Sequence, residues 1–260
     1  MRSRLLLCLF LISFLTLVPA TAGRIVVNHD EWTTANAGFT NAGAANVTQF
    51  VQNVAAFMNI NGGPGNFLIW SSNFSLNGPN ATSFQAALTS GGYSFTVDPS
   101  LPMTLANLSP YDGIFMAGAP IAKNDTVLTQ YVNNGGSVYI AAGTGSFSGG
   151  AAGEAAYWNS FLSNFDLALA PTYNGCCGVD TVEGTHPVLA GVAQLYYNNG
   201  NTLSVVGLGP NSQIIERQGP TGAGVGLIGV YDNVPEPSTY LLLSGGLAVL
   251  AFARKLRSRA

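Results

Sequence analysis

Three adjacent side chains that can carry out acid–base or metal chemistry follow the first apolar run of the chain. The run is Arg24–Asn28, and it is followed by His29, Asp30 and Glu31. An imidazole beside two carboxylates offers ligands for a metal ion, and it also offers a general base and a general acid. Adjacent residues seldom point the same way, however, so Asp30 can equally cap a turn. We expect the structural, loop-ordering role, and acid–base chemistry is the alternative.

Serine, threonine and glycine residues follow later apolar runs of the chain. The carboxyl ends of parallel strands meet at one edge of a sheet, where ligands bind. We therefore expect a polar, glycine-lined crevice beside the histidine and the two acids, made by Ser71, Gly143, Thr144, Gly145 and Ser146. The glycine loop has no phosphate-loop lysine and does not match a dinucleotide fingerprint, so no cofactor is expected.

Two adjacent cysteines, Cys176 and Cys177, lie between glycines in the second half of the chain. They form no disulfide framework and have no paired spacing for zinc, so no metal site is expected. Three states remain open for them: two free thiols, a vicinal disulfide, or pairing with another molecule in an oxidising compartment. Flanking glycines would permit the unusual backbone of a vicinal disulfide.

Short apolar runs alternate with segments of helical periodicity through the first two thirds of the chain. Strands are predicted at 24–28, 66–70, 93–97, 112–118 and 137–142, and helices at 44–59, 80–89, 124–134 and 153–165. Continuous apolar strands that alternate with amphipathic helices are typical of an α/β domain with a doubly wound, mostly parallel sheet.

The pattern changes after about residue 170, where short strands are separated by turns rich in glycine and asparagine. These strands are predicted at 194–198, 202–206, 212–217 and 225–231. We interpret them as a β-rich hairpin extension of the same sheet and not as a second domain.

The N-terminus has the features of a secretory signal peptide. Arg2 and Arg4 precede an apolar core, and Ala20-Thr21-Ala22 is an A-x-A cleavage site. Residues 1–22 are therefore predicted to form a signal helix that signal peptidase removes.

The C-terminus has three consecutive blocks. Val234, Pro235, Glu236 and Pro237 are followed by the uncharged apolar segment 238–253, and a basic cluster closes the chain at Arg254, Lys255, Arg257 and Arg259. The apolar segment predicts a short transmembrane helix, and the basic cluster predicts a cytoplasmic end. The prolines disfavour helix before the span, so a processing enzyme would meet an extended segment. A plain membrane anchor without processing is the alternative.

These three blocks resemble the PEP-CTERM sorting signal of exported proteins of Gram-negative bacteria. The resemblance implies that 234–260 is recognised by exosortase, a membrane-embedded protease. It also implies export through the inner membrane, and then a place at the cell surface, on the outer membrane or in the extracellular matrix. The exported α/β domain is accordingly expected at 23–233.

The exported part is acidic and poor in charge. Three basic and eleven acidic side chains lie between residues 23 and 234, which gives a net charge of −8. This charge excludes a basic surface for nucleic acid. A surface rich in amides and hydroxyls suits contact with exopolysaccharide. Trp32 is the best candidate for an aromatic that stacks on sugar, although packing in the core is the more common role for such a residue.

The element order resembles the class I glutamine amidotransferase-like fold, a flavodoxin-like sandwich, over roughly residues 24–206. The segments that carry the resemblance are 111–118, the helix and strand at 128–145, and Thr185–Val192, which resembles the "H-P-hydrophobic-x-G-hydrophobic" segment of its non-enzymatic branches. Active members place a cysteine in the strand-to-helix turn, with a His–Glu pair elsewhere. Here that position falls on or beside Gly143, and no H-x-E pair occurs. Thr144 and Ser146 are nearby hydroxyls that lack a positioned base.

Two classes of function therefore remain open. The first, which we favour, is an exported, non-catalytic binding or structural module associated with exopolysaccharide. The second is an extracellular hydrolase that uses the crevice near His29, Asp30 and Glu31.

Overall fold

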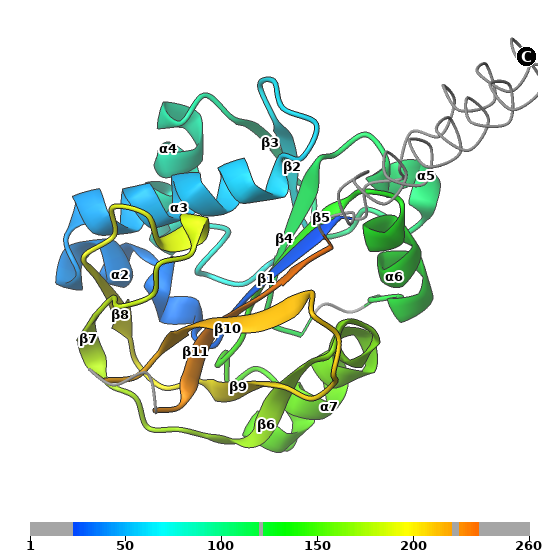
Figure 1. Ribbon diagram of the computed structural model, residues 1–260. Coiled ribbons are helices and arrows are strands. Elements are labelled where there is room, and N and C mark those ends of the chain that lie inside the picture. Colours follow the sequence, from blue (N-terminus) through cyan, green and yellow to red (C-terminus); the bar gives the residue numbers. More distant parts are fainter. Residues whose placement is uncertain (1–22, 120–121, 220–223, 234–260) are drawn as a thin grey trace, which may run out of the picture. The chain divides into compact units, whose positions relative to one another are not determined.

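A mixed sheet with helices on both faces forms the part of the chain that the structure describes. The computed structural model describes residues 23–119, 122–219 and 224–233. Figure 1 shows the strands, which are β1 (Arg24–Asn28), β2 (Asn66–Ile69), β3 (Ser94–Val97), β4 (Gly113–Ala117), β5 (Ser137–Ala141), β6 (Leu167–Tyr173), β7 (Gly178–Thr181), β8 (Gln194–Tyr197), β9 (Asn201–Val205), β10 (Ser212–Arg217) and β11 (Gly226–Asp232).

The large sheet has a parallel half and an antiparallel half. Within the described residues its order is β3-β2-β4-β5-β1-β11-β9-β6, with β10 paired to β11. The first five strands of this order are parallel neighbours, whereas β11, β9, β6 and β10 pair antiparallel. Strand β1 lies where the two halves meet, so residues that follow β1 are covered by segments from both.

The four predicted helices are found as α3, α4, α6 and α7, with α7 beginning three residues earlier than predicted, and the shorter helices were not predicted. The helices of the described residues are η1 (Glu31–Thr33), α2 (Asn36–Asn41), α3 (Ala44–Met58), η2 (Pro79–Ala81), α4 (Thr82–Ser90), α5 (Leu105–Leu108), α6 (Asp125–Asn133), α7 (Gly150–Leu162), η3 (Ser163–Phe165) and η4 (Pro187–Leu189). Asn124 caps α6, because its side chain accepts from the backbone N–H of Val127 at 3.1 Å.

Alternating side chains of the strands build one apolar cluster on each face of the sheet. Val26 belongs to the cluster that contains α3 and α4, whereas Ile25 and Val27 belong to the cluster that contains α6 and α7. Figure 1 shows α2, α3 and α4 together on one side of the sheet and α5, α6 and α7 on the other. The doubly wound arrangement of helices is thus present.

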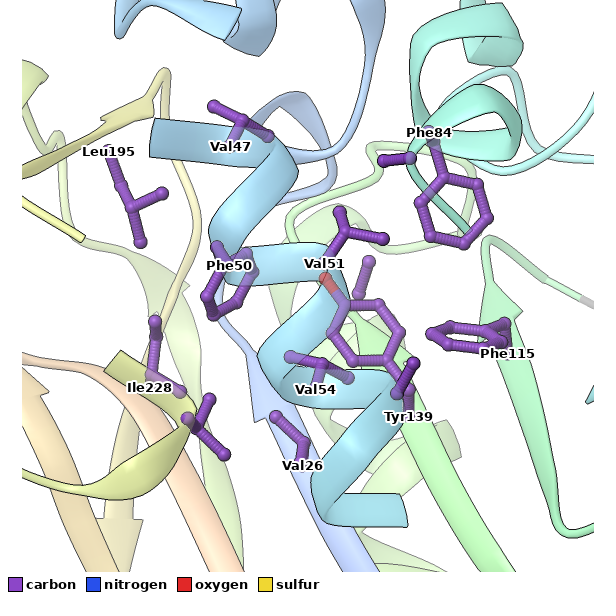
Figure 2. Packing of buried hydrophobic residues seen from close by; sticks show 14 of the residues in the cluster. Val26, Val47, Phe50, Val51, Val54, Phe84, Phe115, Tyr139, Leu195 and Ile228 are labelled. Atoms are coloured by element: carbon purple, nitrogen blue, oxygen red, sulfur yellow. The ribbon is translucent and has the colours of Figure 1, made fainter. Parts of the chain in front are cut away.

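Helix α3 supplies the central packing on its face. Figure 2 shows Phe50, Val51 and Val54 of α3 among side chains from several strands and from α4, namely Val26, Tyr139, Phe115, Leu195, Ile228 and Phe84. These side chains are almost completely buried. Burial of each of these side chains stabilises the folded state by about 1.5–3 kcal/mol relative to an exposed position. The packing of α3 therefore fixes the strands beneath it.

The C-terminal extension differs in part from the prediction. The segments at 202–206, 212–217 and 225–231 do join the large sheet, as β9, β10 and β11. The segment predicted at 194–198 does not, because β8 pairs antiparallel with β7 in a separate two-stranded sheet. Strand β6 was not predicted. It contains Pro171, which is unusual in a strand but is tolerated at the edge of a sheet, where β6 lies.

Both predicted membrane-related segments, 1–22 and 238–253, lie outside the described residues. The sorting motif at Val234–Pro237 and the basic cluster also lie there. Within 23–119, 122–219 and 224–233, we find no helix whose length and apolar character would let it cross a membrane.

Candidate functional site

The turn after β1 is built around the carboxylate of Asp30. One oxygen of Asp30 accepts from the backbone N–H of Trp32 at 2.9 Å and so caps η1. The other oxygen accepts from the backbone N–H groups of Asn198 and Asn199, the latter at 2.8 Å. Burial raises the pKa of Asp30 to about 6. The three backbone N–H donors act in the opposite direction and lower the pKa, because they stabilise the charged carboxylate. Asp30 therefore ties β1 to the turn between β8 and β9.

His29 is enclosed by the same turn. Its side chain is 0% exposed, and its ring centroid lies 4.8 Å from that of Tyr197. The Asn174 amide nitrogen lies 3.3 Å from Nδ1, while Nε2 is a buried atom with no hydrogen-bond partner among the described residues. Burial lowers the pKa of His29 to about 3, so the imidazole is neutral. A Cβ added to Gly200 would lie 1.8 Å from the carbonyl oxygen of His29.

Glu31 and Glu154 approach one polar region from different elements. Glu31 belongs to η1 and is 3% exposed, and its Oε2 accepts from Asn73 at 2.5 Å. Glu154 belongs to α7 and is 0% exposed, and it accepts from the hydroxyl of Thr144 at 3.1 Å. Burial raises the pKa of Glu31 to about 8 and that of Glu154 to about 7, and the nearby charges of Asp30 and Glu154 raise the first further. The two carboxyls are thus electrostatically coupled.

Tyr173 and Ser71 complete this region. Burial raises the pKa of the Tyr173 phenol, and the charges of Glu154 and Glu31 raise it further. Ser71 follows β2; its hydroxyl donates to the Ala117 carbonyl at 2.8 Å and accepts from the backbone N–H of Asn73 at 3.0 Å. Ser71 therefore positions the amide that binds Glu31.

The turn after β5 holds the predicted glycine loop. Gly143 has φ +71°, and a Cβ there would lie 2.8 Å from the His29 carbonyl oxygen and 2.9 Å from the Cα of Gly200. Gly145 and Ser146 are exposed beyond it. The turn between β8 and β9 thus fills the space directly over the end of β5.

The structure brings most of the predicted crevice residues to one edge, but it closes that edge. His29, Asp30, Glu31 and Ser71 are buried, Gly143 and Thr144 are half-buried, and only Gly145 and Ser146 are exposed. Sequence reasoning missed Glu154 and Tyr173. The signal for Glu154 is its position four residues before Trp158, on the apolar face of α7.

The pH dependence of stability tests the carboxyl pair. The folded-state pKa values of Glu31 and Glu154, about 8 and about 7, lie above the ordinary 4.5, so the folded state retains protons that the unfolded state has released. This stabilisation is complete below pH 4.5 and is lost as the pH rises through 7 and 8. His29 has the opposite effect, but only below its ordinary pKa of 6.5. We therefore expect the free energy of unfolding in urea to fall between pH 6.5 and 8, and to fall less in Glu31→Gln.

Glu183→Gln is the matched control, because Glu183 is exposed. Its pH profile should follow that of the unsubstituted protein. Equal slopes for Glu31→Gln and the unsubstituted protein over this window would show that Glu31 is not held protonated.

Cys176 and Cys177 form a vicinal disulfide between β6 and β7. Cys176 is buried and Cys177 is exposed. The backbone N–H of Cys176 donates to the side-chain oxygen of Asn174 at 3.0 Å, and Asn174 also contacts His29. The disulfide is thus connected to the β1 turn through one asparagine.

Comparison with known proteins identifies the tail of the chain. Residues 233–257 match the PEP-CTERM protein-sorting motif. Neither the curated proteins nor the solved structures gave a match. The motif indicates an exported protein that is sorted through exosortase, implies processing by that enzyme, and implies a cell-surface or extracellular location.

Proposed function

We propose that this chain is an exported, non-catalytic module that associates with exopolysaccharide after exosortase has processed its tail. We further propose that the α/β domain is a degenerate relative of the class I glutamine amidotransferases. The sorting motif at 233–257 supports the first half of this proposal. The geometry of the turn after β5 supports the second.

The observation that carries the non-catalytic assignment is the filled space over Gly143. A nucleophile in a strand-to-helix turn needs a side chain, and it needs open space in which a substrate carbonyl can approach. Gly143 provides no side chain, and Gly200 and the His29 carbonyl occupy the space where one would project. The only imidazole at this edge among the described residues is that of His29, which is buried.

The charges of the domain favour a neutral polysaccharide. Each basic side chain of the described domain has an internal partner: Arg24 binds Asp232 at 2.8 Å, Lys123 binds Asp125, and Arg217 donates to the Gly224 carbonyl at 3.2 Å. A domain with a net charge of −8 and no free cation among its described residues repels acidic polymers. Hydroxyl-rich neutral polymers remain suitable, because they bind through hydrogen bonds and aromatic stacking.

An aromatic pair beside the carboxyl edge is the proposed contact for sugar. Trp32 and Phe74 are both half-buried, and their rings meet edge to face with centroids 4.9 Å apart. Trp32 follows β1 and Phe74 follows β2, so both lie where the parallel strands end. A half-buried indole fixed by a second ring offers an apolar face at low entropic cost.

Co-sedimentation with the exopolysaccharide of the producing bacterium tests this function. Trp32→Ala should weaken binding by about 5- to 10-fold, which corresponds to about 1 kcal/mol of lost stacking. Tyr93→Ala is the matched control, because Tyr93 is a half-buried aromatic at the opposite, amino end of β3. It should bind like the unsubstituted protein. Equal binding by Trp32→Ala would contradict the proposed contact.

The same samples decide between the module and a hydrolase. The raised pKa values of Glu31 and Glu154 favour a protonated carboxyl that could act as a general acid, which makes hydrolysis the second candidate. New reducing ends in the polymer, lost in both Glu31→Gln and Glu154→Gln, would establish the hydrolase. An intact polymer with unsubstituted protein supports the module.

A further inference from the structure

In the two-stranded sheet of β7 and β8, one acidic side chain, that of Asp180, lies on the face that is buried against the core. In the register of this pair, Asp180 is opposite Leu195 and Gly178 is opposite Tyr197. Opposed residues share a face, so Asp180 lies on the same face as Leu195 and Tyr197, which are both buried. The alternate position holds Val179, which is 45% exposed. A carboxylate faces inward while a valine faces water, which is the reverse of an ordinary amphipathic strand.

The inward carboxylate has an unsatisfied oxygen. Oδ2 of Asp180 is buried and has no hydrogen-bond partner among the described residues, and the same holds for the hydroxyl of Tyr197. Tyr197 is only 1% exposed. Burial raises the pKa of this phenol, and the charges of Glu216 and Asp180 raise it further. Buried polar atoms without partners are costly, so a ligand bound to the Asp180 oxygen would stabilise this face of the two-stranded sheet.

Two sulfur atoms lie beside this carboxylate. The Sγ atoms of Cys176 and Cys177 and a carboxylate oxygen of Asp180 all lie within 4.8 Å of one another. A disulfide carries no charge and is a poor metal ligand. When a dithiol reductant transfers two electrons and two protons to it, the reductant becomes a disulfide and the protein gains two thiols. A divalent metal ion then displaces the two thiol protons and binds the thiolates.

We propose that Cys176, Cys177 and Asp180 form a binding site for a thiophilic divalent ion such as Zn²⁺ in the reduced protein. Two thiolates and one carboxylate supply three anionic ligands of the types that zinc accepts. Their combined negative charge exceeds the positive charge of the ion. Tyr197 lies on the same face of the two-stranded sheet as Asp180, and its buried hydroxyl is a further polar group on that face. Disulfide formation closes the site and reduction opens it. This proposal does not depend on the polysaccharide function.

Cadmium titration of the reduced chain with Cys8→Ser, in detergent, tests the site, because Cys176 and Cys177 are then its only thiols. The protein is reduced with dithiothreitol, desalted without oxygen, and titrated with Cd²⁺ while the thiolate-to-cadmium charge-transfer band is recorded. Zn²⁺ affinity is then measured by competition. We expect one ion per chain, bound with a charge-transfer band, and no band in the oxidised protein.

Three variants separate the site from unspecific binding to thiols. Cys177→Ser should reduce the band to half its intensity or less, and because Cys177 is exposed its fold should be retained, which circular dichroism checks. Asp180→Asn should keep the band but weaken Zn²⁺ binding by about 100-fold or more, since losing even an outer-shell partner costs about 10- to 100-fold. Glu183→Gln, at an exposed acid three residues away, should leave binding unchanged. Equal Zn²⁺ affinity in Asp180→Asn and the unsubstituted protein, or a band of undiminished intensity in Cys177→Ser, would overturn the proposal.

Discussion

Gly200→Ala is expected to destabilise the domain by about 3 kcal/mol or more, because overpacking a tight site costs about 1–3 kcal/mol before any hydrogen bonds are lost. The added Cβ would lie 1.8 Å from the carbonyl oxygen of His29 and 2.4 Å from its Nδ1. The turn between β8 and β9 must then move, and Asp30 loses the N–H donors of Asn198 and Asn199. For a domain of this size the melting temperature should fall by about 10 °C. Thermal unfolding followed by circular dichroism measures the change.

Gly62→Ala separates the steric effect from the backbone effect. Gly62 has φ +69°, but nothing lies within 4 Å of an added Cβ. This substitution pays only the left-handed backbone penalty of about 1–2 kcal/mol. A Gly200→Ala protein that melts as high as Gly62→Ala would mean that the turn does not pack on His29 as described.

Replacing both Pro235 and Pro237 with alanine is expected to block processing of the tail, so that most of the exported chain remains as membrane-associated precursor. Proline at these positions disfavours helix before the apolar run, and a protease reads backbone in extended form. Alanine favours helix at both positions, so the substitutions remove the restriction that the prolines impose. Fractionation with immunoblotting, and the intact mass of the product, measure the outcome in cells that contain exosortase.

Pro210→Ala is the control for the loss of a proline, since Pro210 is exposed in a turn of the exported domain. Sorting of this variant should match that of the unsubstituted chain. A full-length product in the cytosol, or normal processing without the two prolines, would show that the motif at 233–257 does not direct sorting here.

The predicted elements and the observed ones agree closely where local periodicity is strong. The helix predicted at 44–59 is α3 (Ala44–Met58), and the strand predicted at 24–28 is β1 (Arg24–Asn28). The apolar positions of α3 repeat every three or four residues, and such spacing depends only on neighbours in the chain. The helix predicted at 153–165 is three residues out of place, because α7 begins at Gly150 and ends in the η3 turn.

The candidate site could be predicted only in part. The sequence placed His29, Asp30 and Glu31 at the carboxyl end of β1, since the strand before them is apolar. It did not show that Asn198 and Asn199 would engage Asp30, because these residues are separated from it by 168 and 169 positions. Nor did it show that Glu154 would reach the region of Glu31. Contacts at such separations leave no periodic signal.

The sequence by itself indicated that this protein is exported, because the sorting motif at 233–257 is linear and needs no tertiary contacts. It also determined the order of the strands and the longer helices in the parallel half, since apolar spacing is a local property. Only the tertiary structure decided that the crevice is closed and that Asp180 faces inward beside Cys176. Burial depends on which distant segments pack together, and a side chain's chemistry follows from that burial.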